Sequence, residues 1–161
     1  MDLYPWLVYV HIAGVIVFAL GHGVSVGVAF KVRGERDPNR IQALLQLSTW
    51  SLSLFYVGMT LLLAGGIWAG FTPGAEGSWW EDAWIWTALA TFVLTMFAMY
   101  GLATNYYRRI RTIVEAMVEG SQAVSQEQLA QEVSGSRPWV LAIVGLGSIL
   151  FILYLMIFKP F

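Results

Sequence analysis

Four long apolar segments, separated by short polar connectors, dominate the pattern of hydrophobic and polar positions along the chain. A helix needs about 20 mostly apolar residues to cross a bilayer, and each segment is long enough. We expect membrane-spanning helices over residues 4–31, 48–71, 83–107 and 138–158. The pattern therefore predicts an all-α fold, with a single membrane domain over residues 1–161 built as a four-transmembrane-helix bundle. The composition agrees, because 58% hydrophobic and 12% charged residues leave too little polar surface for a soluble domain of this size.

The basic residues predict the orientation of the bundle. Of nine lysines and arginines, four lie in residues 31–40 and three in residues 108–111, whereas the connector 72–82 has none. Since basic connectors favour the cytoplasmic side, we expect both termini outside, in a multi-pass protein of a bacterial-type inner (cytoplasmic) membrane. Tryptophans are expected to form a belt at the outer interface: Trp68, Trp79, Trp80, Trp84 and Trp86.

Residues 108–136 are predicted to form a short helical hairpin in the cytoplasm. The third helix continues past the membrane and stops at Gly120, and a new helix starts at Ser125, where Ser-Gln-Glu-Gln resembles a capping box. Its charges are typical of a solvated face. Docking of a partner subunit on this hairpin is the alternative.

The two histidines, His11 and His22, both lie in the first span. At about 100° and 1.5 Å per residue, their spacing places them on one helix face, roughly 16 Å apart along the axis. An ionisable side chain in hydrocarbon needs a partner. Three interpretations stay open: ligation of a metal or cofactor, hydrogen bonding to a neighbouring helix as part of packing, and a proton or ion path.

Small residues near the histidines favour access to the imidazoles. Glycine lets a backbone or a flat ring approach closely, and glycines stand on both sides of His22. Ordinary helix packing explains the same glycines. We take as candidates for cofactor binding three residues of the histidine face and the two glycines beside His22: Gly14, Phe18, Ser25, Gly21 and Gly23.

Counting residues from the membrane surfaces predicts which positions lie level with each histidine. His22 should share its level with residues 50–55, 96–100 and 145–148. Met96 or Met99 could then serve as a soft axial ligand and Tyr100 as a hydrogen-bonding partner. No strong second ligand is expected at the level of His11. A haem there would be five-coordinate, or would take water or a second subunit's histidine.

What the chain lacks excludes several kinds of chemistry. It has no cysteine, which rules out disulfides, iron–sulfur clusters and covalent haem attachment, so any haem would be held non-covalently. Apart from Lys31 at the end of the first span, the spans contain no Asp, Glu, Lys or Arg, unlike a proton pump or ion-coupled carrier. Two bis-histidine haems would need four histidines, which a homodimer could supply.

The opening LVYVHIAGVIVFALGHGVSVGVAF, followed by a basic connector and QALLQLS, resembles the first helix pair of a family of uncharacterised bacterial integral membrane proteins. That family looks distantly related to the copper-resistance D proteins and to the J-type protoporphyrinogen oxidases of haem biosynthesis. The resemblance implies a four-helix unit in which His11 is a haem or metal ligand. The haem-biosynthesis proteins are expected to keep charged residues in their spans, so porphyrinogen oxidation is not expected here.

These observations predict a membrane protein that binds haem b through His11, His22 or both. Its function would be electron transfer between a membrane quinone and a haem or protein partner, as a component of a membrane oxidoreductase. One alternative is a non-catalytic subunit or assembly factor with structural histidines, and another is copper or small-molecule transport. We expect the lipid bilayer and a homodimer or larger membrane complex as partners, and no nucleic acid.

Overall fold

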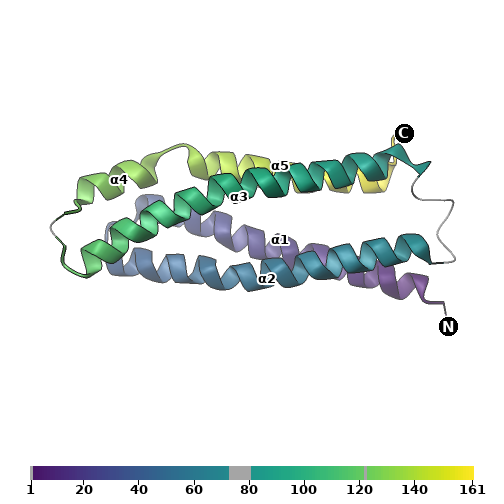
Figure 1. Cartoon of the computed structure of the whole chain (residues 1–161), viewed down its shortest axis with the longest axis horizontal. Helices are drawn as coiled ribbons and strands as arrows, with labels where there is room; N and C mark the ends of the chain where they lie inside the picture. The colour runs from purple at the N-terminus through teal and green to yellow at the C-terminus, as the bar shows by residue number, and fades with distance from the viewer. Residues whose placement is uncertain (1, 73–80, 122) are drawn as a thin grey trace.

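The computed structural model describes residues 2–72, 81–121 and 123–161, which form an elongated bundle of helices (Figure 1). The described residues contain these helices and no strand: α1 (Tyr4–Gly34), α2 (Pro38–Phe71), α3 (Ala83–Val118), α4 (Gln126–Ser134) and α5 (Arg137–Phe158). Four helical segments are long and apolar enough to cross a membrane, namely α1, α2, α3 and the segment made by α4 and α5. The predicted all-α fold with four spans is confirmed.

Local sequence explains where the helices begin. Proline occupies the first turn of α1, α2 and α5, where its missing N–H does no harm. The carboxylate of Asp37 caps α2 by accepting a hydrogen bond from Asn39 N at 3.0 Å. The expected capping box at the start of α4 is present, with Ser125 and Gln128 bonded to each other's backbone.

Two helix pairs make up the bundle, α1 with α2 and α3 with α5 (Figure 1). Glycines bring α1 and α2 together, because a Cβ added at Gly21 would lie 2.7 Å from Phe55 N and one at Gly65 would lie 2.7 Å from His11 N. A Cβ added at Gly14 would likewise overlap backbone atoms of α2. This close approach of backbones is the usual way in which membrane helices associate.

The hydrophobic core lies at the end of the bundle that carries α4. All five helices contribute buried side chains to it, including Val32, Ile41, Tyr106, Val133 and Leu141. Helix α2 starts at Pro38, ten residues before the membrane span that the sequence predicts, and Ile41 lies in this additional part of the helix. The sequence predicts that this end stands in water, where the hydrophobic effect would favour such a core.

Both chain termini lie at the other end of the bundle (Figure 1). Large apolar side chains are exposed on the outer surface there. Exposed apolar residues are expected where helices face lipid. Trp68 and Trp86 are 63% and 53% exposed there, as an interfacial belt requires, whereas Trp79 and Trp80 lie outside the described residues. Which end faces the cytoplasm stays a prediction from the basic residues.

The two helix pairs are tied together near the α4 end. Tyr107 of α3 donates a hydrogen bond to the backbone oxygen of Ser25 in α1 at 2.5 Å, and Arg111 of α3 donates one to Thr49 of α2 at 2.6 Å. The ribbons of the two pairs stand further apart toward the termini in Figure 1. We call the boundary between the α1/α2 pair and the α3/α5 pair the seam.

Candidate functional site

A small cavity in the seam is lined by residues from α1, α2, α3 and α5. It has a volume of about 50 Å³. Aromatic and aliphatic side chains form most of its wall, as is typical of cofactor and ligand sites in helical bundles. The lining residues that bear on its chemistry are Phe18, His22, Phe55, Phe92, Met96, Met99, Gly145 and Ser148.

His22 enters this cavity with an unsatisfied nitrogen. The residue is only 7% exposed, and its Nε2 atom is buried without a hydrogen-bond partner among the described residues. The ring lies against Gly145 of α5, where an added Cβ would overlap Nε2 and Cε1. Because a buried unpaired polar atom is unfavourable in an apolar interior, this nitrogen is a candidate for ligation.

Two methionines of α3 line the same cavity. Met96 and Met99 are three residues apart and therefore share one helix face. Their thioethers, together with the imidazole of His22, form a soft donor set suited to haem iron or to Cu(I). The described residues contain no group of three or more His, Cys, Asp or Glu side chains that could hold a metal, so a metal here would depend on methionine.

The hydroxyl groups of the cavity wall are already bonded. Thr95 donates to the Oγ atom of Ser148 at 2.8 Å, and Ser148 donates to the backbone oxygen of Val144 at 2.6 Å. Thr91, one turn before Thr95, donates to the oxygen of Thr87 in its own helix. Hydroxyls occupied in this way do not favour a polar conduction path along α3.

His11 lies in a different environment, against α2. Its Nδ1 atom is 2.6 Å from the backbone oxygen of Leu62, and a Cβ added at Gly66 would lie 2.7 Å from Nδ1. Since a carbonyl only accepts, Nδ1 carries the proton and Nε2 keeps its lone pair. Nε2 is buried without a partner among the described residues, but His11 does not line the cavity. The hydrogen bond to Leu62 agrees with a role of His11 in helix packing. Because Nε2 has no partner among the described residues, ligation of a metal or cofactor by His11 stays open as well.

A comparison with protein families identifies the group to which this chain belongs. The family described as "Predicted integral membrane protein (DUF2269)" matches residues 5–160. The chain belongs to the DUF2269 family. No curated protein and no solved structure matches it. The family description supports an integral membrane protein and assigns no activity. The likeness to copper-resistance D and J-type protoporphyrinogen oxidase proteins is not shown by these comparisons and stays a resemblance.

The levels predicted around His22 agree with the structure of this DUF2269 protein. Phe55, Met96, Met99 and Gly145 all line the cavity that His22 enters. Phe18 lines it too, with its ring centroid 4.6 Å from that of Phe55. The structure thus brings these four residues to the cavity beside His22, whereas a role in ligand binding stays a prediction.

Other candidate residues are not brought to His22. Tyr100 is 74% exposed, and Gly23 is exposed with no atom within 4 Å of an added Cβ. Ser25 bonds instead to α2, with its Oγ atom 3.1 Å from that of Ser48 and 3.2 Å from that of Ser51. These positions do not contribute to the cavity of the DUF2269 chain.

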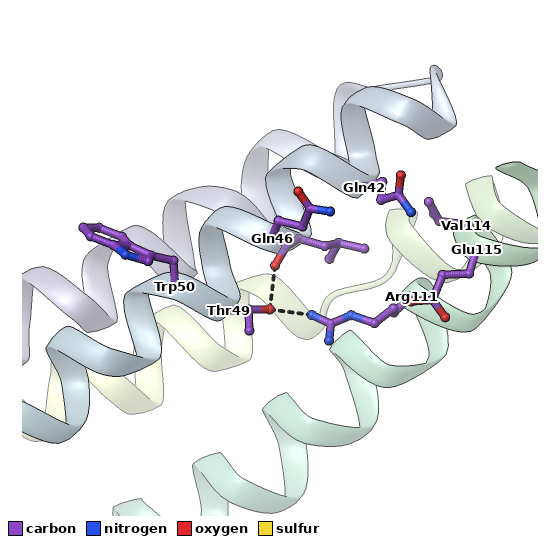
Figure 2. Close-up of a pocket in the computed structure, with 8 residues that line it drawn as sticks. Gln42, Gln46, Thr49, Trp50, Arg111, Val114 and Glu115 are labelled. Atoms are coloured by element: carbon purple, nitrogen blue, oxygen red, sulfur yellow. Dashed lines mark hydrogen bonds between the residues drawn. The ribbon is translucent and has the colours of Figure 1, made fainter.

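A larger cleft between α2 and α3, near the α4 end, was not predicted from the sequence (Figure 2). It has a volume of about 380 Å³. In the sequence, Arg111 counts only toward the orientation of the bundle, and no motif marks Gln42 or Gln46. One sequence signal points to this cleft: polar residues recur on one side of α2 at the level where arginines appear in α3.

Proposed function

We propose that this DUF2269 protein is a multi-pass protein of a bacterial inner membrane that binds haem b in the seam. His22, together with Met96 or Met99, would hold the haem. The observation that carries the proposal is the buried Nε2 atom of His22, which has no partner among the described residues and belongs to a residue that lines a cavity together with two methionines. Haem, when bound, would supply one-electron redox chemistry for transfer between a membrane quinone and a protein partner.

The donors and the walls of the cavity suit an iron porphyrin. Imidazole and thioether are a known axial pair that raises the reduction potential. Phe18, Phe55 and Phe92 would exclude water from the ring, and Gly145 leaves room for the imidazole. This chain would thus hold the iron, keep its surroundings dry and set its potential through the axial ligands.

The volume of about 50 Å³ is far below that of a porphyrin, so binding requires the helix pairs to separate at the seam. The hydrogen bonds of the bundle would allow such a movement. The bonds of Tyr107 and Arg111 join the pairs near the α4 end, whereas the bond of Thr95 stays within the α3/α5 pair and that of His11 within the α1/α2 pair. Separation toward the termini would leave all of these bonds intact.

Copper is the second candidate, because the cavity as it stands has room for a single ion. One imidazole and two thioethers are ligands that favour Cu(I) over harder cations. A copper site would need no separation of the helix pairs. This function, in copper binding or transport, is supported by the cavity volume and by the same three side chains.

Oxidised and reduced spectra of the purified protein, combined with metal analysis, separate the two functions. Haem binding predicts a Soret band that is lost in His22→Ala and recovered when imidazole is added. The α-band should shift in Met96→Leu or Met99→Leu and stay unchanged in Met156→Leu, which does not line the cavity. Copper binding predicts no Soret band and one copper per chain, lost in His22→Ala. A Soret band that survives in His22→Ala, or a protein with neither metal, would contradict the site.

A further inference from the structure

The cleft between α2 and α3 gathers polar side chains near the α4 end (Figure 2). Four of them have ends that can bond a ligand, two carboxamides, one guanidinium and one carboxylate: Gln42, Gln46, Arg111 and Glu115. Trp50, which is 63% exposed, lines one side of the cleft. Its volume of about 380 Å³ is in the range of small-molecule sites.

Arg111 is held in place on the cleft wall. Its Nη2 atom donates to Thr49 Oγ1 at 2.6 Å, and Thr49 donates in turn to the backbone oxygen of Leu45 at 2.9 Å, as Figure 2 shows. A guanidinium has five N–H donors, and among the described residues this is the hydrogen bond that Arg111 makes. It forms no ion pair with a described acidic residue. Its remaining donors therefore suit an anion with several oxygens, such as a phosphate.

Glu115 supplies the opposite charge one turn away. It follows Arg111 by four residues, so the two side chains lie on the same face of α3, about 6 Å apart along the axis. The cleft thus presents a cation and an anion at a short separation along α3. A ligand that carries both charges, joined by a short bridge, would match this pair.

The cleft lies at the level of lipid headgroups. Trp50 and Trp68 are both exposed on α2 and are 18 residues apart, which corresponds to about 27 Å, close to the thickness of the hydrocarbon layer. Indole rings favour the interface on each side of that layer. Arg111 and Thr49 therefore lie at the boundary marked by Trp50, where the phosphates of a leaflet stand.

We propose that this cleft binds a zwitterionic membrane phospholipid with an ethanolamine headgroup. The phosphodiester accepts hydrogen bonds from Arg111, and the ammonium group donates to Glu115. Gln42 and Gln46 bond the remaining oxygens, while the acyl chains pass Trp50 into the hydrocarbon layer. The lipid would pack between α2 and α3 across the seam and so strengthen the contact between the helix pairs.

Native mass spectrometry with an equimolar mixture of phosphatidylethanolamine, phosphatidylglycerol and phosphatidylcholine tests the proposal on the full chain. The wild type should retain the ethanolamine lipid in preference to both others. Arg111→Gln should reduce retention about tenfold, which corresponds to the loss of a charge-assisted hydrogen bond. Arg108→Gln is the matched control, because Arg108 bonds to Asn105 on its own helix and does not line the cleft.

Glu115→Gln keeps the contact of Arg111 with the phosphate and removes the contact with the ammonium group. This variant therefore tests the headgroup preference even if Arg111→Gln does not fold. It should retain phospholipid but lose the preference for ethanolamine over glycerol. A wild type that prefers phosphatidylglycerol, or an equal loss in Arg108→Gln, would overturn the proposal. Displacement of the lipid by soluble glycerophosphoethanolamine would show a site for the headgroup alone and would overturn it as well.

Discussion

Gly145 of α5 makes room for the imidazole of His22 from α1, since an added Cβ at position 145 would overlap Nε2 and Cε1 of the ring. Both residues are buried. This contact joins the two helix pairs in the middle of the bundle, and His22 lines the same cavity as Met96 and Met99. The proposed site therefore depends on a residue that has no side chain.

Gly145→Ala should displace the ring of His22 and reduce the bound metal or haem. A methyl group forced into a packed site typically costs about 1–3 kcal/mol of stability. Gly147→Ala is the matched control on the same helix, because no atom lies within 4 Å of a Cβ there. Thermal unfolding in detergent and the haem or copper content of both variants measure the effect. Equal behaviour of the two variants would show that the contact does not matter.

The sequence of this protein predicts the level of a residue along the bundle much better than the direction in which its helix turns it. Apolar length and the helix rise determine which residues are level, and Phe55, Met96, Met99 and Gly145 do line the cavity beside His22, whereas Tyr100 does not. The angle at which α3 faces the seam is decided by packing against other helices. That angle turns Met96 and Met99 inward and leaves Tyr100 74% exposed, and no local pattern distinguishes the three.

The same limit applies to the glycines and to Arg111. Gly21 and Gly23 both flank His22, but only Gly21 meets the backbone of α2. The sequence does not distinguish the two glycines, because the position of α2 decides which of them its backbone approaches. Arg111 was used to predict orientation, and its bond to Thr49 depends on a residue 62 positions earlier, which spacing along the chain does not reveal.

Gly58→Ala should separate α1 from α2. A Cβ at Gly58 would overlap the backbone nitrogen of Phe18, and backbone atoms yield less readily than a flexible side chain. We expect a loss of about 1–3 kcal/mol, measured by unfolding in detergent. Gly27→Ala on α1 is the control, with no atom within 4 Å of the new methyl group. It should be neutral or stabilise by up to about 1 kcal/mol, because alanine favours helices over glycine. A Gly58→Ala protein as stable as Gly27→Ala would refute the close approach.

His11→Asn and His11→Leu test the bond to Leu62. Asparagine keeps an N–H donor near the position of Nδ1, whereas leucine leaves the oxygen of Leu62 without that donor. His11→Leu should lose about 0.5–1.5 kcal/mol of stability, and His11→Asn less. If His22 is the ligand, both variants keep the Soret band or the copper. Loss of the cofactor in His11→Asn would instead assign ligation to the Nε2 atom of His11.

Glu35 should make the connector between α1 and α2 sensitive to acid. Its carboxylate accepts hydrogen bonds from the backbone N–H groups of Arg36 and Asp37, which lower the pKa of this group below 4.5. A lowered pKa means that the folded protein favours the charged form, so the stabilisation is present above pH 4.5 and is lost as the pH falls through the folded value. Glu35→Gln should remove part of the acid dependence of the unfolding temperature below pH 4.5. Superimposable pH profiles of the two proteins would contradict this.

Opening of the seam is the movement that haem binding requires, and the absence of cysteine from the chain allows a direct test by crosslinking. Phe18 and Phe92 face each other across the seam, with ring centroids 6.1 Å apart. Cysteines at these two positions, joined by a short thiol-specific crosslinker before haem is added, should prevent haem binding. They should leave copper binding unchanged, because the ion needs no separation of the helices.

The matched control joins positions 18 and 55, whose rings are 4.6 Å apart within the α1/α2 pair. This crosslink also replaces two aromatic residues of the cavity wall but does not close the seam. Haem titration followed by the Soret band should therefore show binding in the crosslinked Phe18→Cys/Phe55→Cys protein and none in crosslinked Phe18→Cys/Phe92→Cys. Reduction of a cleavable crosslinker should restore binding in the second protein. Full haem binding with positions 18 and 92 crosslinked would exclude the seam as the haem site, because a porphyrin does not fit between helix pairs held at that distance.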